Sequence, residues 1–541
     1  MDYKQRCKYL ENRIKHLNLI GIALSTEDDL DKLFEMIMDE AKHITNADGR
    51  TLYMKSDDGN NLNFEILLND SMGSAMGGTS GNKVTLPPVR LFNEKSHPNE
   101  SNVAAYVANT GKTVNISDAY KEDGFDFSGT KSFDKITGYR SKSFLTVPLK
   151  NHENEIIGVM QLINSIDSKS NKPVSFSNEM QTQIESLCSQ GAVALTNKRL
   201  VQELKTLFEA FIQLIAKAID EKSEYTGGHC ERVPEITMML ADAVEKVDYG
   251  KYKDFSMTEE ERYELYIAGW LHDCGKVATP PHIVDKGTKL ETIFDRIETV
   301  QTRFEVLKRD IEIKYLKEKI NRLENGQTQP SNSDYQLEKD LEVVDQERII
   351  VEKANIGGEF MDKEEQDKIK KIANKYSWIN SGKKEPFLSD KEVENLCIPK
   401  GTLLPEEREI INDHIRITID MLEKLPYPKH LKNVPEFAGG HHEKLDGTGY
   451  PKGLKAHEMS VQAKMMAIAD IFEALTAADR PYKDGKKLSQ AMRIMGFMKD
   501  DYHIDKDLFE IFVKEGVYRK YADKYVKKNQ IDKVDELKVL D

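Results

Sequence analysis

A short segment near residue 445 combines two adjacent histidines with a carboxylate and a glycine-rich turn. It runs from His441 and His442 through Glu443 to Tyr450 and Pro451. Imidazole nitrogens are common metal ligands, and glycines allow the tight backbone turns that bring ligands together. This segment therefore predicts one edge of a metal site.

Three other segments carry the same kinds of side chain. The pair His272-Asp273 ends an apolar run, and His414 and Asp470 each stand within a helical pattern. Together the four segments offer a mixed nitrogen and oxygen set, which suits iron, manganese or zinc better than calcium. The two oxygens of Asp273 can bridge two ions about 3.5–4 Å apart. We therefore expect a metal centre to which four separate segments contribute.

The order of these segments resembles the HD-GYP branch of the HD-domain metal phosphohydrolases. The matching pieces are His272-Asp273 with Gly275 and Lys276 behind it, then His414, then 441–451, then Asp470 and 479–482. A lone His-Asp pair is a weak signal, whereas the complete ordered set is highly specific. The resemblance implies an all-α HD-type domain over residues 223–515, which hydrolyses a cyclic dinucleotide such as cyclic di-GMP to linear pGpG or GMP.

The same resemblance implies roles for individual side chains. Two divalent ions, iron or manganese, would be held by His272, Asp273, His414, His441, His442 and Asp470. Asp273 and Lys276 are the expected catalytic groups, acting with a metal-activated water. Lys276, Arg480 and Lys483 would hold the phosphates, and Tyr450 would line the base pocket.

His229 lies at the start of this domain, and two interpretations of it stay open. It is either a further metal ligand or a histidine that hydrogen-bonds beside the core. In relatives of the trinuclear type a glutamate precedes this histidine by four residues, where this chain has Tyr225. Glu224 is one position off, so its side chain would leave a helix about 100° away. The sequence therefore favours two ions over three.

Two alternative functions use the same residues. A phosphodiesterase for another cyclic nucleotide, such as cyclic GMP-AMP, would need the same metals. A non-catalytic receptor would bind the dinucleotide and signal through another part of the chain. The complete ligand set counts against the receptor.

The first two hundred residues have a different pattern. A short helix is expected at 1–24, followed by a helix that begins near Asp28. Strand-like runs lie at 51–54, 64–68, 145–149 and 156–163. Mixed helices and strands of this kind predict an α+β module with a central antiparallel sheet flanked by helices.

Residues 25–197 of this module resemble a GAF domain, a class of small-molecule sensors. The matching segments are 104–111, 114–120, 137–140 and 148–164. The signature of cyclic-nucleotide-binding members is not matched, because Ser165 follows Asn164. The resemblance therefore leaves open both a small-molecule ligand and a purely structural or dimerising role.

A helix without strong breakers joins the two domains. Apolar residues alternate by four and three at Leu200, Leu204, Leu207, Phe211, Leu214 and Ala218. A period of 3.5 is typical of a coiled-coil seam, so residues 198–222 predict a signalling helix that pairs with its copy in a homodimer. The alternative is an amphipathic helix that packs on its own domain.

Two further segments depart from a compact HD-type domain. Residues 291–399 separate the His-Asp pair from His414 and contain two seams of period 3.5 around a polar turn, which predict an inserted antiparallel helical hairpin. Its role is left open between capping the active site, contacting a partner and lengthening the dimer. Residues 516–541 are expected to form a charged C-terminal tail that frays.

Length and composition limit the number of domains and the class of protein. A chain of 541 residues should hold two or three domains, and its mean hydropathy of -0.58 is typical of a soluble protein. No apolar run approaches the roughly 18 residues of a membrane span, and the N-terminus has no signal-peptide pattern, so we expect a cytoplasmic protein. The net charge of -14 disfavours binding to long nucleic acid.

Overall fold

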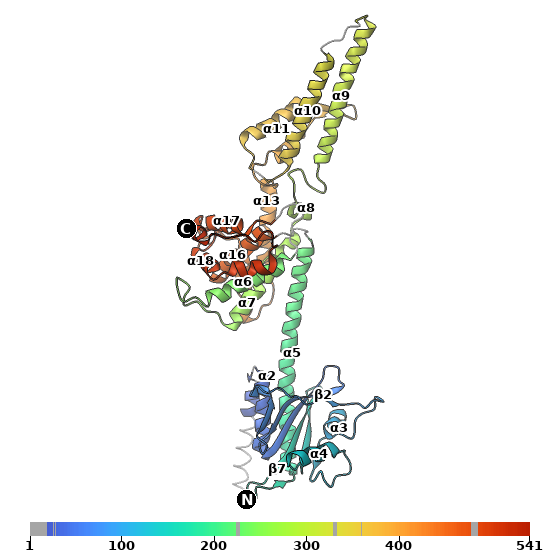
Figure 1. The fold of residues 1–541 in the computed structure, drawn as a ribbon, viewed down its shortest axis with the longest axis vertical. Coiled ribbons are helices and arrows are strands. Elements are labelled where there is room, and N and C mark those ends of the chain that lie inside the picture. Colours follow the sequence, from blue (N-terminus) through green and yellow to red (C-terminus); the bar gives the residue numbers. More distant parts are fainter. Residues whose placement is uncertain are drawn as a thin grey trace. The chain divides into compact units, whose positions relative to one another are not determined.

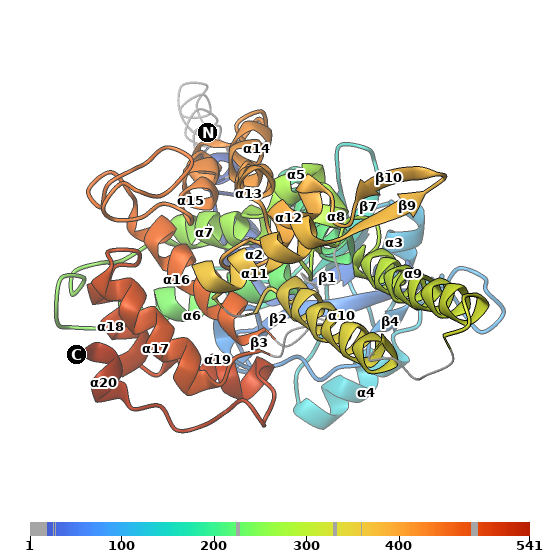
Figure 2. The same ribbon diagram turned by 90° about the horizontal axis from the view of Figure 1, so that it is seen from above.

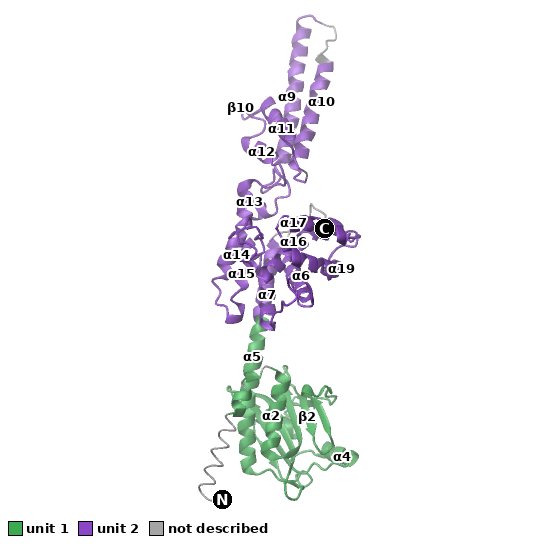
Figure 3. Ribbon diagram, turned by 90° about the vertical axis from the view of Figure 1, so that its left-hand side faces the viewer, with its two compact units in different colours: residues 1–207 green, residues 208–541 purple. Residues whose placement is uncertain are grey.

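The computed structural model of the chain forms two compact units, residues 1–207 and 208–541 (Figure 3). The residues it describes are 19–24, 26–27, 29–222, 228–327, 333–358, 360–477 and 485–541. Of the helix expected at 1–24, residues 19–24 are helical and the rest lie outside this described set.

The first unit is organised around one antiparallel sheet. The strands are β1 (Ala47–Lys55), β2 (Asn61–Asn69), β3 (Ser74–Gly77), β4 (Val89–Arg90), β5 (Val114–Ile116), β6 (Phe144–Lys150), β7 (Ile156–Ile166) and β8 (Pro173–Val174). Their order is β3-β2-β1-β7-β6-β5, with β4 beside β2 and β8 beside β7. Figure 1 labels two of these strands, β2 and β7. All four predicted strand runs lie within β1, β2, β6 and β7.

Helices complete this α+β unit. They are α2 (Leu30–Thr45), α3 (Val103–Thr110), α4 (Ser128–Thr137), the short η1 (Gly78–Ser80) and the beginning of α5 (Asn178–Lys222). The apolar face of α2 packs against α5, where a Cβ on Gly191 would come within 2.8 Å of Ile37. Glycine at this position therefore allows the two helices to approach closely. The predicted fold class of the N-terminal domain is confirmed.

Helix α5 is continuous over 45 residues. It begins in the apolar core of the first unit, with Leu187 and Ala192 buried, and ends in the core of the second, with Ala216 buried. The predicted seam from Leu200 to Leu214 is exposed in the single chain. The expected domain boundary at 197/198 thus falls inside a helix without interruption.

The second unit is a helical bundle apart from one small hairpin. Its main helices are α6 (His229–Val244), α7 (Glu259–Leu271), η2 (Cys274–Ala278), α8 (Pro281–Val284), α13 (Pro405–Asn412), α14 (His414–Leu422), η3 (Lys429–Leu431), α15 (Val434–Gly439), α16 (Val461–Thr476), α17 (Leu488–Asp500) and α18 (Lys506–Lys514). They surround one apolar core that includes Val233, Leu265 and Phe472. The C-terminal helical domain is therefore confirmed.

The insertion forms a lobe with its own core, around Phe304 and Phe387. Its elements are α9 (Ile297–Glu324), α10 (Ser333–Asn355), α11 (Lys363–Lys375), β9 (Ser377–Asn380), β10 (Lys383–Pro386) and α12 (Asp390–Leu396). Helices α9 and α10 lie side by side (Figures 1 and 2), and hydrogen bonds from Gln301 to Glu352 and from Tyr315 to Asp340 fix them as antiparallel. The predicted hairpin is present, but α11, α12 and a two-stranded sheet accompany it.

The C-terminus differs from the expected frayed tail. Residues 516–541 contain α19 (Val517–Tyr525) and α20 (Glu536–Leu540), and the side chains of Tyr518 and Tyr521 are buried in the core of the second unit. The many charged residues of this segment conceal two apolar faces, and burial of large aromatic side chains outweighs the tendency of chain ends to fray.

Among the described helices, none has a stretch long and apolar enough to cross a bilayer.

Candidate metal centre

The predicted metal ligands come from five helical segments of the second unit. His272 and Asp273 follow the end of α7, His414 begins α14, His441 and His442 follow α15, and Asp470 lies within α16. His229 begins α6. Five of these side chains are at least nine-tenths buried: His229, His272, Asp273, His414 and His441. The fold therefore brings together residues that are up to 241 positions apart in the sequence.

A repeated local device orients three of the histidines. The Nδ1 atoms of His272, His414 and His441 lie 2.6, 2.5 and 2.6 Å from the carbonyl oxygens of Gly269, Ile411 and Ala438, in each case three residues earlier. A carbonyl only accepts, so Nδ1 carries the proton and the lone pair is on Nε2. The helical turn before each histidine thus aims an unprotonated nitrogen at a common centre, as metal-binding histidines require.

Three buried polar atoms at this centre lack hydrogen-bond partners within the described part of the chain. They are Asp273 Oδ1, His414 Nε2 and His441 Nε2. His414 Nε2 lies 3.1 Å from Asp273 Oδ1, but without the geometry of a hydrogen bond. An unpaired buried polar atom costs about 1–3 kcal/mol. Divalent metal ions would satisfy all three atoms, so the residues present fit a metal site.

The donors fall into three overlapping groups whose ligand atoms lie within 4.8 Å of one another. These are His414 with His441 and His442, His229 with His272 and Asp470, and His272 with Asp273 and His441. All six predicted ligands and His229 belong to these groups. Overlapping groups are what a centre of more than one ion needs.

The electrostatics of the centre favour the metal-binding protonation states of Asp273, His441 and His442. Burial alone would raise the pKa of Asp273, but Lys276 and His272 outweigh it and hold that pKa well below its ordinary value. Burial lowers the pKa of His441 well below its ordinary value and that of His442 to about 4. Charged carboxylates and neutral imidazoles are the forms that bind metals. At His229 burial alone would lower the pKa, but Glu473 and the two aspartates outweigh it and raise that pKa well above its ordinary value.

Glu473 is a buried carboxylate that the sequence analysis did not single out. Its Oε2 lies 2.5 Å from His229 Nδ1, and its Oε1 accepts from the guanidinium of Arg232. This contact turns His229 Nε2 toward Asp273 and Asp470, each 3.2 Å away. A carboxylate behind a histidine is a common arrangement in metal sites, and it favours the ligand interpretation of His229. The available signal was the one-turn spacing between Asp470 and Glu473 within residues 465–475, which are otherwise apolar.

The glycine-rich segment after His442 forms a braced loop. The buried Glu443 carboxylate accepts from the backbone N–H groups of Lys452 and Leu454, at 2.7 and 2.9 Å. A Cβ on Gly449 would lie 2.2 Å from the Lys444 nitrogen, so only glycine fits there. Tyr450 stacks on His442 with ring centroids 5.0 Å apart, which places it directly beside a ligand.

Of the three predicted phosphate-binding cations, the structure describes one. Lys276 is in place, with its ammonium 2.5 Å from Asp273 Oδ2 and its side chain 24% exposed. Arg480 and Lys483 lie outside the described residues, as do Glu224 and Tyr225, on which the preference for two metals depends.

Close backbone packing joins the His-Asp segment to the next ligand. A Cβ on Gly275 would lie 2.0 Å from the carbonyl oxygen of His414, and the Gly275 N–H donates to Thr418 Oγ1 at 2.9 Å. Glycine is therefore required at 275 for η2 to approach α14.

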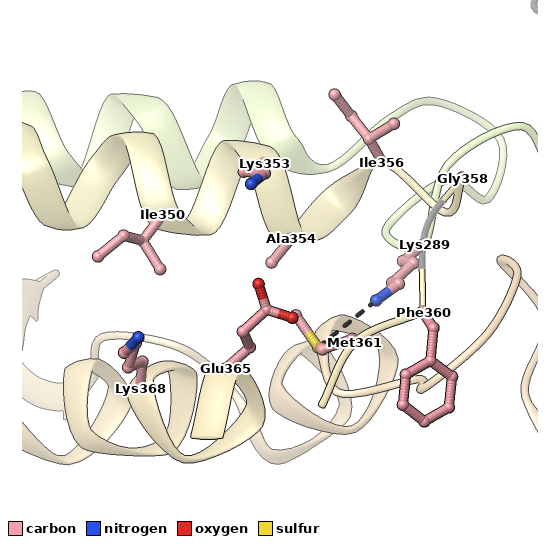
Figure 4. A pocket seen from close by; sticks show the side chains of 10 residues that line it. All are labelled: Lys289, Ile350, Lys353, Ala354, Ile356, Gly358, Phe360, Met361, Glu365 and Lys368. Carbon is pink, nitrogen blue, oxygen red and sulfur yellow. Dashed lines mark hydrogen bonds between the residues drawn. The ribbon is translucent and has the colours of Figure 1, made fainter. Parts of the chain in front are cut away.

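The inserted lobe contains a separate cavity of about 610 Å³ (Figure 4). The buried ammonium of Lys289 donates there to the carbonyl oxygens of Leu396 and Ile398, at 3.1 and 2.7 Å, and lies 3.7 Å from Met361 Sδ. Glu365 is the sole carboxylate among the described residues that line it. This cavity lacks the donor set of the metal centre.

The sequence matches two protein families. It matches the HD domain family over residues 226–356 and again over 390–508, and the GAF domain family over 29–195. All six predicted ligands and His229 lie within the two HD matches.

Several curated proteins are similar to parts of the chain. The 3'3'-cGAMP-specific phosphodiesterase 1 of Vibrio cholerae is 42% identical over 81 residues, which are 15% of this chain and 19% of that protein. The cyclic di-GMP phosphodiesterase of Thermotoga maritima is 34% identical over 135 residues, 24% of this chain and 36% of that protein. The matched region thus spans between about a fifth and a third of these relatives.

Solved structures also match part of the chain. The GAF domain from Acinetobacter phosphoenolpyruvate-protein phosphotransferase is 15% identical, with a TM-score of 0.26 over 35% of this chain and 96% of that chain. A GAF domain/HD domain protein from Geobacter sulfurreducens is 14% identical, with a TM-score of 0.22 over 33% of this chain and 98% of that chain.

Proposed function

The chain joins a GAF domain to an HD domain that is homologous to HD-GYP-type cyclic di-GMP and cyclic GMP-AMP phosphodiesterases, and we propose on this basis that it is a metal-dependent phosphodiesterase. The proposed substrate is a cyclic dinucleotide, with cyclic di-GMP as the first candidate. The observation that carries this proposal is the convergence of His229, His272, Asp273, His414, His441, His442 and Asp470 on one buried centre. Two ions, iron or manganese, are proposed to occupy it.

The proposed chemistry divides between metal and protein. When bound, the ions lower the pKa of coordinated water and neutralise charge on the phosphoryl oxygens. The carbonyls behind His272, His414 and His441 keep the Nε2 atoms unprotonated for metal binding. Asp273 presents two oxygens between the histidines, and Lys276 provides the cation nearest to it for a substrate phosphate. Tyr450, beside His442, is proposed to contact a base.

A second candidate substrate is 3'3'-cyclic GMP-AMP. Two Vibrio cholerae relatives, 42% and 37% identical over 81 and 125 residues, are named as phosphodiesterases specific for it. Both substrates are cyclic dinucleotides with two phosphodiester bonds, so the same metal-binding residues serve either one.

Product analysis tests the function. Purified protein loaded with Mn²⁺ or Fe²⁺ is incubated with each dinucleotide, and the products are separated by ion-exchange chromatography. We expect linear dinucleotide or mononucleotide from at least one substrate, and none from the Asp273→Ala variant. Binding of both dinucleotides without cleavage, in fully metal-loaded protein, would instead support a receptor.

We also propose that the protein is a homodimer regulated through its GAF domain. Leu204 and Leu214 on α5 are 66% and 62% exposed, although their spacing is that of a coiled-coil seam. A second copy of α5 would bury this seam, and sedimentation velocity at micromolar concentration would detect the dimer. The GAF ligand is proposed to be a small molecule.

A further inference from the structure

The last three turns of α5 are built into the core of the HD domain. Ile212, Ala216 and Ile219 are at most 5% exposed and share an apolar cluster with Val233 of α6 and Leu265 of α7. This end of the helix is therefore fixed to the same helices that precede and follow the metal ligands.

Asp220 connects this turn to the segment that carries His229. Its carboxylate, 7% exposed, accepts from the backbone N–H of Cys230 at 3.2 and 3.4 Å. Helix α6 begins at His229, and its N-cap residue Gly228 has no side chain to bond the free N–H groups of the first turn. Asp220 provides that missing cap from a neighbouring helix, immediately beside a metal-binding histidine.

Lys222 connects the same turn to the segment that carries Asp273 and Lys276. Its ammonium donates to the carbonyl oxygens of Lys276, Val277 and Thr279, at 3.1, 2.5 and 2.7 Å. An ammonium has three donors, and all three are used on the one short helical turn, η2, and its end. Charge-assisted hydrogen bonds of this kind are stronger than neutral ones. Lys276 in turn contacts Asp273.

We propose that Asp220 and Lys222 are positioning residues, through which the end of α5 sets the placement of His229 and of the Asp273–Lys276 turn together. The proposal rests on the function proposed above and adds a physical route for its regulation. Helix α5 has no break between the core of the GAF domain and this turn, so a rotation or shift of the helix would act on both metal-binding segments at once. Neither residue touches the reacting atoms.

The decisive test removes the Lys222 ammonium. It measures the Kd for Mn²⁺ by isothermal titration calorimetry, and the kcat and KM for dinucleotide hydrolysis by steady-state kinetics. For Lys222→Met we expect Mn²⁺ affinity and kcat to fall by about 10- to 100-fold, the range seen when groups behind metal ligands are removed. KM should change much less. Lys222→Arg, which keeps charge and donors, should recover most of both losses.

The matched control is Lys217→Met, an exposed lysine one and a half turns earlier on the same helix, which should behave like wild type. Asp220→Ala, which removes the acceptor of the Cys230 N–H, should weaken Mn²⁺ binding as well and decides the matter if Lys222→Met does not fold. Wild-type Mn²⁺ affinity in whichever of these two variants fold would overturn the proposal. So would an equal loss in Lys222→Arg and Lys222→Met. If wild type cleaves no dinucleotide, the proposed function fails, and Mn²⁺ binding still tests the positioning.

Discussion

Two buried carboxylates of the HD domain show how differently the same group is used. Glu392 in the inserted lobe is 3% exposed, and Asp273 at the metal centre is 1% exposed. Arg303 pairs with both oxygens of Glu392, at 2.8 and 3.2 Å, and the Ser389 N–H donates to it as well. Asp273 has Lys276 on one oxygen, whereas the other faces His414 without a hydrogen bond.

The hydrogen bonding of the two carboxylates separates the structural role of Glu392 from the functional role proposed for Asp273. Burial alone would raise the pKa of both carboxyls, and in each case neighbouring cations reverse the shift and lower it. A lowered pKa therefore does not distinguish the two sites. What distinguishes them is the unpaired oxygen of Asp273 among histidines with unpaired Nε2 atoms, because both oxygens of Glu392 accept hydrogen bonds.

The largest expected effect is on turnover when Asp273 is truncated. Asp273→Ala removes a proposed ligand whose oxygens face His229, His272 and His414, so we expect a loss of roughly 10³-fold or more in kcat. Product chromatography measures this loss, with circular dichroism to verify the fold. Wild-type turnover in a folded, metal-analysed variant would exclude the proposed metal mechanism.

Metal removal should have a comparable effect on activity and an additional one on stability. Dialysis against a chelator should abolish turnover and lower the Tm, because metal bound to the native state alone stabilises that state. Elemental analysis after anaerobic purification should approach about two ions per chain. A reproducible value near three would show that another group replaces the glutamate expected at position 225.

An intermediate effect is expected at Glu473. Glu473→Gln keeps the shape of the side chain but weakens the contact that orients His229, so Mn²⁺ affinity and kcat should fall by about 10- to 100-fold. Titration calorimetry and steady-state kinetics measure the two quantities. Unchanged Mn²⁺ affinity would mean that His229 is not a ligand.

A smaller effect is expected from the register of α5. Four residues inserted after Leu204 rotate everything downstream by about 40°, whereas seven nearly restore the seam. We expect the four-residue variant to change basal activity within the ~1–3 kcal/mol typical of allosteric coupling, and the seven-residue variant to change it much less. Equal activities of the two dimeric variants would make α5 a passive tether.

The smallest effect on activity, and a clear one on stability, is expected in the lobe. Arg303→Met leaves Glu392 buried without its partner and should destabilise the lobe by about 3–5 kcal/mol, while kcat and Mn²⁺ affinity stay close to wild type. The folded pKa of Glu392 is lowered, so its contribution to stability is present above the ordinary glutamate pKa and is lost as pH falls through the folded pKa. Urea unfolding at pH 7 and pH 4 should show that Arg303→Met removes this part of the pH dependence. A large loss of activity would mean that the lobe shapes the metal centre.

The sequence by itself predicted the candidate ligands, because a metal site needs particular residue types and the resemblance to HD-GYP phosphohydrolases fixes their order. His272-Asp273, His414, His441-His442 and Asp470 were all singled out in this way, and the structure brings them together. The strands of the GAF domain were likewise predictable, since alternation and turn residues are local signals.

Contacts between residues far apart in the sequence could be identified only from the tertiary structure. Glu473 lies 244 residues from His229, and Lys222 lies 54 to 57 residues from the carbonyls it binds, so no periodic pattern marks either contact. The helical C-terminus was missed for a related reason. Its charged composition predicts fraying, and only the packing of Tyr518 and Tyr521 into the core reverses that prediction. Local patterns report residue type and periodicity, whereas burial and pairing depend on which distant segments the fold brings together.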